Sequence, residues 1–180
     1  MPWGDYGDIL LTGMTSHLSR HNELLQYERT GPFQPDIVIS GLSNLLVTDS
    51  VKRRFEFSDI KGFKFKPVIK RHISHVDWTS WDLQKEDPEF YPDNGEPENY
   101  ILSLAHSQEL ANRMEAVWEV IVEENRTFID SRTYKHDNKE VDVMLTGNSS
   151  WFLVTERAKM WIENNCDQWT EFRDVDEFPY

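Results

Sequence analysis

Three histidines in the middle of the chain have neighbours that could support metal binding or catalysis. His72 and His75 are three residues apart, a spacing that would bring two metal-ligating imidazoles together on a helix. Their surroundings are typical of a strand, where residues i and i+3 point to opposite faces, so a metal site is disfavoured. His106 precedes Ser107, but the GxSxG motif of a nucleophile elbow is absent, and Ser107 is explained more simply as a helix N-cap.

The sequence contains no other pattern that indicates catalysis. It has no Gly-rich phosphate loop and no CxxC metal motif, and Cys166 stands beside an acid rather than a base. We therefore expect a non-enzyme without cofactor or metal. The alternative is an enzyme of unrecognised type that uses His106, or His72 with His75, together with nearby carboxylates.

Charge is strongly segregated along the chain. Residues 77–98 contain eight acids and one lysine, a local balance of −7, within a chain whose net charge is −13. Aromatic residues stand among these acids, and aromatic anchors amid charge are typical of protein interfaces. The alternative is an aromatic core with a solvated acidic rim. The predicted partner-binding residues are Asp77, Trp78, Trp81, Asp82, Glu86, Asp87, Glu89, Asp93, Glu96 and Glu98.

A basic block precedes the acidic segment. Residues 52–71 contain eight Lys or Arg side chains and two acids, a local balance of +6. Two interpretations stand: a small nucleic-acid patch, or lysines that protect an exposed sheet edge, which the alternation around Phe63 and Phe65 favours. Because the whole chain is acidic, direct binding to nucleic acid or to an anionic membrane is not expected.

Helices and strands that would position these residues are predicted from periodicity and capping. Helices are expected over residues 14–29, from Thr48 or Asp49 onward, from Ser107 onward and in the second half of SWFLVTERAKMWIENN. Strands are expected at residues 36–40, 63–68, 100–104, 140–145 and 170–175, and the segment from Val117 is a strand or a helical extension, with strand favoured. Residues 78–98 are expected to form an ordered loop.

An internal repeat relates two of these segments. Residues 43–68 and 150–175 align at a constant offset of 107, with eight identities in 26 positions. Two similar strand-helix-strand units around one core predict a single α+β domain over residues 1–180, with a mixed or antiparallel sheet and a few short helices. The single cysteine and the absence of an apolar signal or membrane segment predict a cytoplasmic protein.

The two repeat segments resemble immunity proteins of bacterial polymorphic-toxin and contact-dependent competition systems, including those of the type VI secretion kind. The resemblance rests on LLVTDSVKRRFEFSDIKGFKFKPV and WFLVTERAKMWIENNCDQWTEF, in which a strand ends in Val-Thr plus an acid and a short amphipathic helix follows. It implies a small acidic antitoxin that binds one cognate toxin domain. A basic nuclease cleft, occluded by the acidic and aromatic segment, would be the best match. The oligomeric state stays open.

Overall fold

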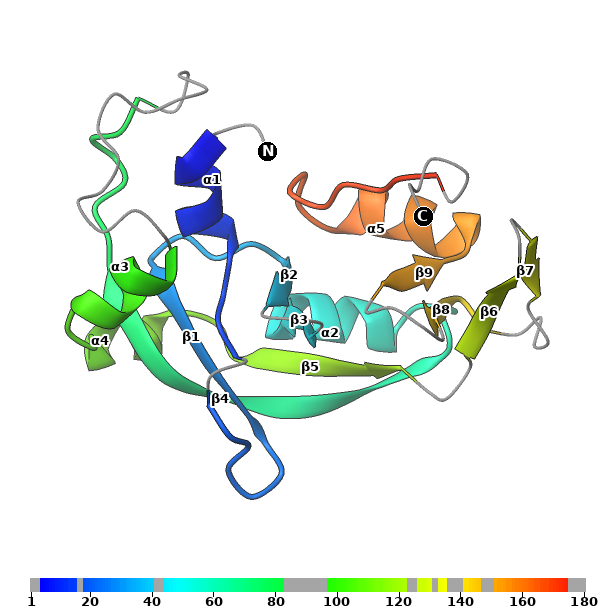
Figure 1. Ribbon diagram of the computed structural model, residues 1–180, viewed down its shortest axis with the longest axis horizontal. Coiled ribbons are helices and arrows are strands. Elements are labelled where there is room, and N and C mark those ends of the chain that lie inside the picture. The colour runs from blue at the N-terminus through cyan, green and yellow to red at the C-terminus, as the bar shows by residue number, and fades with distance from the viewer. Residues whose placement is uncertain are drawn as a thin grey trace.

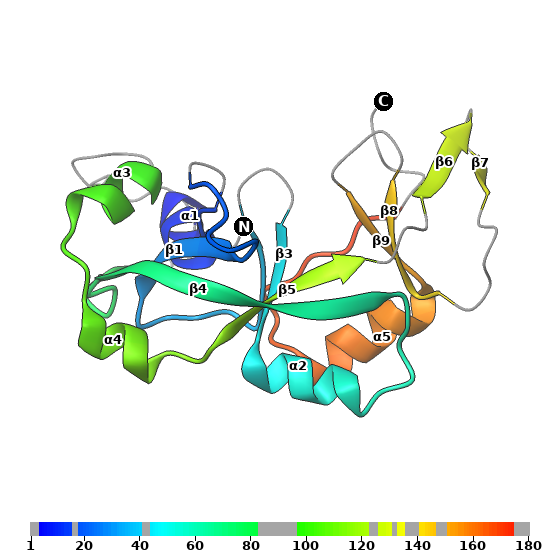
Figure 2. The same ribbon diagram turned by 90° about the horizontal axis from the view of Figure 1, so that it is seen from below.

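The computed structural model describes residues 4–15, 18–40, 44–82, 97–122, 126–130, 133–135, 141–146 and 151–174. Within these ranges the fold is α+β, with five helices and two sheets (Figure 1). No helix in the described ranges has the length and apolar character that crossing a membrane requires. The larger sheet runs along most of the molecule, with α1 (Gly4–Leu11), α3 (Pro97–Ser103) and α4 (Gln108–Arg113) toward one end, α5 (Glu156–Asn165) and the smaller sheet toward the other, and α2 (Asp49–Glu56) along the middle (Figures 1 and 2).

The larger sheet has five strands in the order β1-β4-β5-β3-β2. Its longest strand, β4 (Phe63–His75), pairs antiparallel with β5 (Val117–Val122) through residues 63–67. From Val68 onward β4 pairs parallel with β1 (Leu25–Gly31). Pro67 lies where the partner changes, a position where its missing N–H costs least. The sheet is therefore mixed, and β4 connects the two ends of the molecule.

Two hairpins, each followed by a helix, form one end of the molecule. The first consists of β2 (Ile37–Ser40), β3 (Asn44–Thr48) and α2 (Asp49–Glu56), and belongs to the larger sheet. The second consists of β8 (Val143–Thr146), β9 (Phe152–Val154) and α5 (Glu156–Asn165). The smaller sheet has the order β7-β6-β8-β9 and also contains β6 (Arg126–Asp130) and β7 (Thr133–Lys135).

Both helices begin in the same way, as the repeat predicts. Thr48 and Thr155 are extended N-caps with φ of −70° in each case. Thr48 Oγ1 accepts a hydrogen bond from the Val51 amide, and Thr155 Oγ1 accepts one from the Ala158 amide. A threonine at the strand end thus satisfies an amide of the first helical turn.

The apolar core lies between the larger sheet and these two helices. Val51 and Phe55 of α2 and Ala158 and Ile162 of α5 are all buried in it. The Phe55 ring stacks on Trp161 with ring centroids 4.2 Å apart. The two repeat segments therefore share one core, which the sequence analysis predicts.

The other end of the molecule is formed by β1, the second half of β4 and three short helices (Figure 1). These are α1 (Gly4–Leu11), α3 (Pro97–Ser103) and α4 (Gln108–Arg113). Helix α3 contacts α1, β1 and β4, and α4 contacts β4. Ser107 caps α4 through its Oγ, as predicted, and the segment from Val117 is a strand.

Three predicted elements are wrong. The helix over residues 14–29 is absent, because Leu25–Gly31 pairs with β4 as strand β1 and the pairing overrides the leucine stripe. The strand at residues 100–104 is helical, as part of α3. Residues 170–174 form no strand, so the second repeat unit has the strand and helix of the first but not its final strand.

Candidate functional site

The predicted partner-binding residues that the structure describes lie at the end formed by α1, α3 and α4. Asp77, Trp78, Trp81 and Asp82 directly follow β4, and Glu98 is in the first turn of α3. Because α3 packs on β4, the two groups belong to one end of the molecule (Figure 1). Glu86, Asp87, Glu89, Asp93 and Glu96 lie outside the described residues.

The carboxylates at this end are exposed. Asp77 accepts hydrogen bonds from the amide and the hydroxyl of Thr79, at 3.3 and 2.5 Å. These bonds hold the pKa of Asp77 below its usual value, so the group is charged at neutral pH. Asp82 and Glu98 are also exposed. Glu109 of α4, which the sequence analysis did not select, is 85% exposed and forms an ion pair with Arg113 at 3.9 Å.

The tryptophans differ from the carboxylates because part of each ring is buried. Trp78 meets Phe33 edge-to-face at 5.8 Å, and Phe33 meets Trp169 in the same way at 5.9 Å. Trp78 therefore joins β4 to the C-terminal segment through packing, which agrees with the alternative that these aromatics are structural. Its indole N–H is buried and has no hydrogen-bond partner within the described ranges. Trp81 is half-buried.

Several side chains of the basic block form contacts within the protein. On α2, Lys52 pairs with Glu56 at 2.6 Å, Arg53 with Asp49 at 2.6 Å, and Arg54 with Asp36 at 2.8 Å. The block is thus partly neutralised by its own neighbours, which disfavours a nucleic-acid patch.

Lys70, in the second half of β4, has a different structural role. Its Nζ donates to the carbonyl oxygens of Ala111 and Met114, the latter at 2.8 Å. Burial lowers the pKa of Lys70. The side chain satisfies carbonyl groups at the end of α4 and ties that helix to the sheet.

The histidines considered for catalysis have structural hydrogen bonds. His72 Nε2 donates to the Leu104 carbonyl at 2.8 Å, and His106 Nδ1 accepts from the Ile73 amide at 3.0 Å. The rings of His72 and His106 lie 5.7 Å apart. His75 is exposed and lies on the opposite face of β4 from His72, as the alternation of side chains along a strand predicts. In the part of the chain that the structure describes, no three His, Cys, Asp or Glu side chains are grouped to hold a metal ion.

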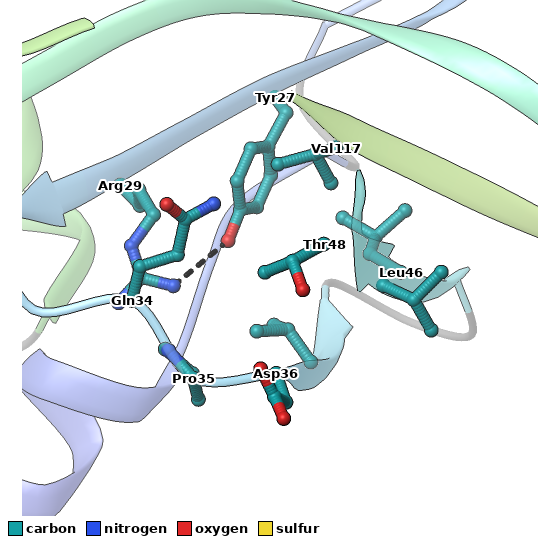
Figure 3. A pocket seen from close by; sticks show the side chains of 10 residues that line it. Tyr27, Arg29, Gln34, Pro35, Asp36, Leu46, Thr48 and Val117 are labelled. Carbon is teal, nitrogen blue, oxygen red and sulfur yellow. Dashed lines mark hydrogen bonds between the residues drawn. The ribbon is translucent and has the colours of Figure 1, made fainter. Parts of the chain in front are cut away.

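Arg29 is a buried cation that the sequence analysis did not single out. Its side chain is fully buried beside a small hollow lined by Tyr27, Gln34, Asp36 and Thr48, among others (Figure 3). The guanidinium donates to the Tyr27 hydroxyl at 3.1 Å, to the Phe33 carbonyl at 2.9 Å and to the carbonyls of Leu10 and Thr30. Arg29 thus binds the end of α1 and the 31–35 turn to β1. The sequence pattern does not indicate this role, because polar and apolar residues of β1 are buried alike and no alternation marks one face.

Cys166 is held in an unreactive form. Burial, assisted by the nearby Asp36 carboxylate, raises the pKa of the thiol to about 12. Since the thiolate is the nucleophile, a thiol with this pKa is essentially inert at neutral pH. The expectation drawn from the acid beside Cys166 therefore agrees with its surroundings in the fold.

Comparison with protein-family models, with curated proteins and with solved structures finds no match for the chain.

Proposed function

We propose that this protein is an immunity protein, which neutralises an intracellular toxin by binding a basic surface of the toxin with the acidic end of the molecule. The acidic end is the region of α3, α4 and residues 76–82. The toxin class that fits best is a nuclease, because its phosphate-binding cleft is basic. No turnover is involved, and the protein acts in the cytoplasm.

The observation that carries the proposal is the solvent exposure of several carboxylates at the acidic end. Asp77, Asp82 and Glu98 are all exposed, and Lys52, Arg53 and Arg54 of the basic block form ion pairs with carboxylates of the same chain. Exposed negative charge is therefore available to a partner at this end of the protein. An exposed field of one sign accelerates encounter with a partner of the opposite sign.

The resemblance of the two repeat segments to immunity proteins supports the same proposal. The distinctive features of that resemblance are the Val-Thr strand ends at Thr48 and Thr155, each followed by an acid. In the fold these residues begin α2 and α5, so the resemblance concerns the scaffold and not the acidic end. The toxin would accordingly be recognised by a surface outside the repeat segments.

The test is an affinity pull-down from the native cell with the full chain as bait, at physiological and at high salt. The expected result is one stoichiometric basic protein whose recovery falls at high salt, because salt screens attraction between exposed charges. Recovery of no partner at either salt would contradict the proposal and favour the enzyme alternative. Recovery that is unchanged by salt would contradict its electrostatic part.

A further inference from the structure

The structure extends the internal repeat backward to include both hairpins. The amide of Thr48 donates to the carbonyl of Asp36 at 3.0 Å, and the amide of Thr155 donates to the carbonyl of Asp142 at 2.9 Å. Asp36 and Asp142 each precede the first strand of a hairpin. The first unit is therefore β2, β3 and α2, and the second unit is β8, β9 and α5.

The two units contact one another reciprocally. The Asp167 amide, after α5, donates to the Asp36 carboxylate at 3.1 Å. The Lys61 amide, after α2, donates to the Asp142 carboxylate at 2.9 Å. Each unit thus binds the segment that follows the helix of the other, as the halves of a two-fold symmetric dimer do.

A cavity of about 120 Å³ lies between the two units. It is lined by equivalent residues of both, among them Val47 with Val154 and Phe55 with Ile162. Among the residues that the structure describes, the lining is almost entirely apolar, with Thr170 and Glu171 as the polar members. Ile39 lines the cavity and is 61% exposed, so the cavity is reached from solvent beside β2.

The second unit has smaller side chains at several positions that line this cavity. Phe55 and Ile37 of the first unit correspond to Ile162 and Val143 of the second, and Phe63, after α2, aligns with Thr170, after α5. The pair Leu45 and Phe152 is the exception, because there the second unit has the larger side chain. A symmetric pair with the larger residues on both sides would fill more of this space. At the three positions where the second unit is smaller, the larger side chains are aromatic or aliphatic, which matches the apolar lining of the cavity.

We infer that the cavity binds a small apolar molecule of about the size of benzene. An apolar cavity of about 150 Å³ engineered in another protein stays dry and binds benzene or xenon, so a cavity of this size and lining suits the same class of ligand. Water here finds few hydrogen-bond partners, so an apolar ligand displaces it at little cost. The site lies away from the acidic end and is independent of the proposed function.

Benzene itself is the probe for the test, added to the full chain during thermal unfolding. At about ten times its Kd, benzene is expected to raise the Tm by about 3 °C. The variant Ile162→Phe/Thr170→Phe, which restores the residues of the first unit, is expected to lose this shift. Ile121→Phe is the matched control, because Ile121 points to the other face of β5 from the cavity-lining Val120 and is partly exposed. It should retain the full shift.

If the double variant does not fold, benzene binding is measured by methyl NMR of the unmodified protein. Benzene should shift the methyl resonances of Val143, Val154 and Ile162, and leave those of Ile73, in a separate apolar cluster, unchanged. An unchanged Tm without methyl shifts would overturn the inference. Equal shifts at Ile73, or a benzene response retained by a folded double variant, would overturn it as well.

Discussion

The two ends of this molecule are stabilised by different interactions. At the end formed by the two hairpin-helix units, Phe55, Trp161 and Ile162 pack in an apolar core. At the acidic end, the fully buried Arg29 holds α1 and a turn through hydrogen bonds to carbonyl oxygens. The first end depends on packing, and the second combines a smaller apolar cluster around Ile73 and Leu110 with the hydrogen bonds of a buried cation.

Because the two interiors stabilise the fold and the exposed acids do not, stability and partner binding should depend on different residues. The apolar end resembles a scaffold, whose charged side chains are largely paired within the domain. The acidic end combines a buried interior, which includes Arg29 and an apolar cluster around Ile73, with exposed carboxylates, so it can present charge without relying on those carboxylates for folding. Substitutions in the two interiors should therefore cost stability, and substitutions of the exposed acids should cost partner binding alone.

The largest loss of stability is expected for Phe55→Ala in the apolar core. Removal of a buried ring leaves a cavity and should lower the free energy of unfolding by about 3–5 kcal/mol, measured by urea denaturation. Phe57→Ala is the matched control, because Phe57 follows the same helix and is 93% exposed. A similar loss in both variants would contradict the assignment of this core.

Arg29→Met tests the buried hydrogen bonds of the acidic end. It should lower the free energy of unfolding, measured by urea denaturation, by about 3 kcal/mol, because it leaves several buried acceptors without a donor. Tyr27→Phe removes only one of these contacts and should cost about 1 kcal/mol in the same assay. If Arg29→Met unfolds at the same urea concentration as the unmodified protein, Arg29 does not hold this end together.

A smaller and pH-dependent loss of stability is expected for Asp142→Asn. Asp142 lies where the two units contact one another. Burial raises the pKa of Asp142, but hydrogen bonds from Arg157, the Lys61 amide and Thr155 outweigh burial and lower it overall. A carboxyl group whose pKa is lower in the folded state stabilises the fold above its unfolded pKa of about 3.9 and loses this contribution as pH falls through the folded value.

The Asn variant should consequently be about 2 kcal/mol less stable at pH 7, and the difference should shrink as pH falls below the unfolded pKa and through the lower folded one. Urea denaturation of both proteins across this pH range measures it. A difference that is constant with pH would show that the charge of Asp142 contributes nothing.

Much of the scaffold could be predicted from the sequence, because its signals are local. The caps Thr48, Thr155 and Ser107 and the alternating residues at the start of β4 each specify their element through contacts with near neighbours in the chain. The repeat also predicted that α2 and α5 share a core. The acidic segment could be recognised by composition, although five of its ten selected residues lie outside the part of the chain that the structure describes.

The remaining features depend on partners distant in sequence. Strand β1 was predicted as a helix because its pairing with β4, some 40 residues later, has no local signal. The structural roles of Arg29 and Lys70 are likewise invisible, since carbonyl groups of other segments define them. His106 was open to two interpretations until its backbone partner, Ile73, could be identified.

Substitution of the exposed acids at the acidic end is expected to have the smallest effect on stability and the largest effect on partner binding. Asp77→Asn/Asp82→Asn/Glu98→Gln should leave the midpoint of urea unfolding unchanged, because all three side chains are exposed. The matched control is Glu56→Gln/Glu156→Gln/Glu163→Gln, which removes the same charge from exposed positions of α2 and α5.

Quantitative pull-down with these two variants and the unmodified chain as baits, at physiological salt, tests the central claim most directly. The account predicts that the acidic-end variant recovers the basic partner at least tenfold less well, and that the control variant recovers it nearly as well as the unmodified chain. Equal recovery by both variants would contradict the claim that the acidic end binds the partner.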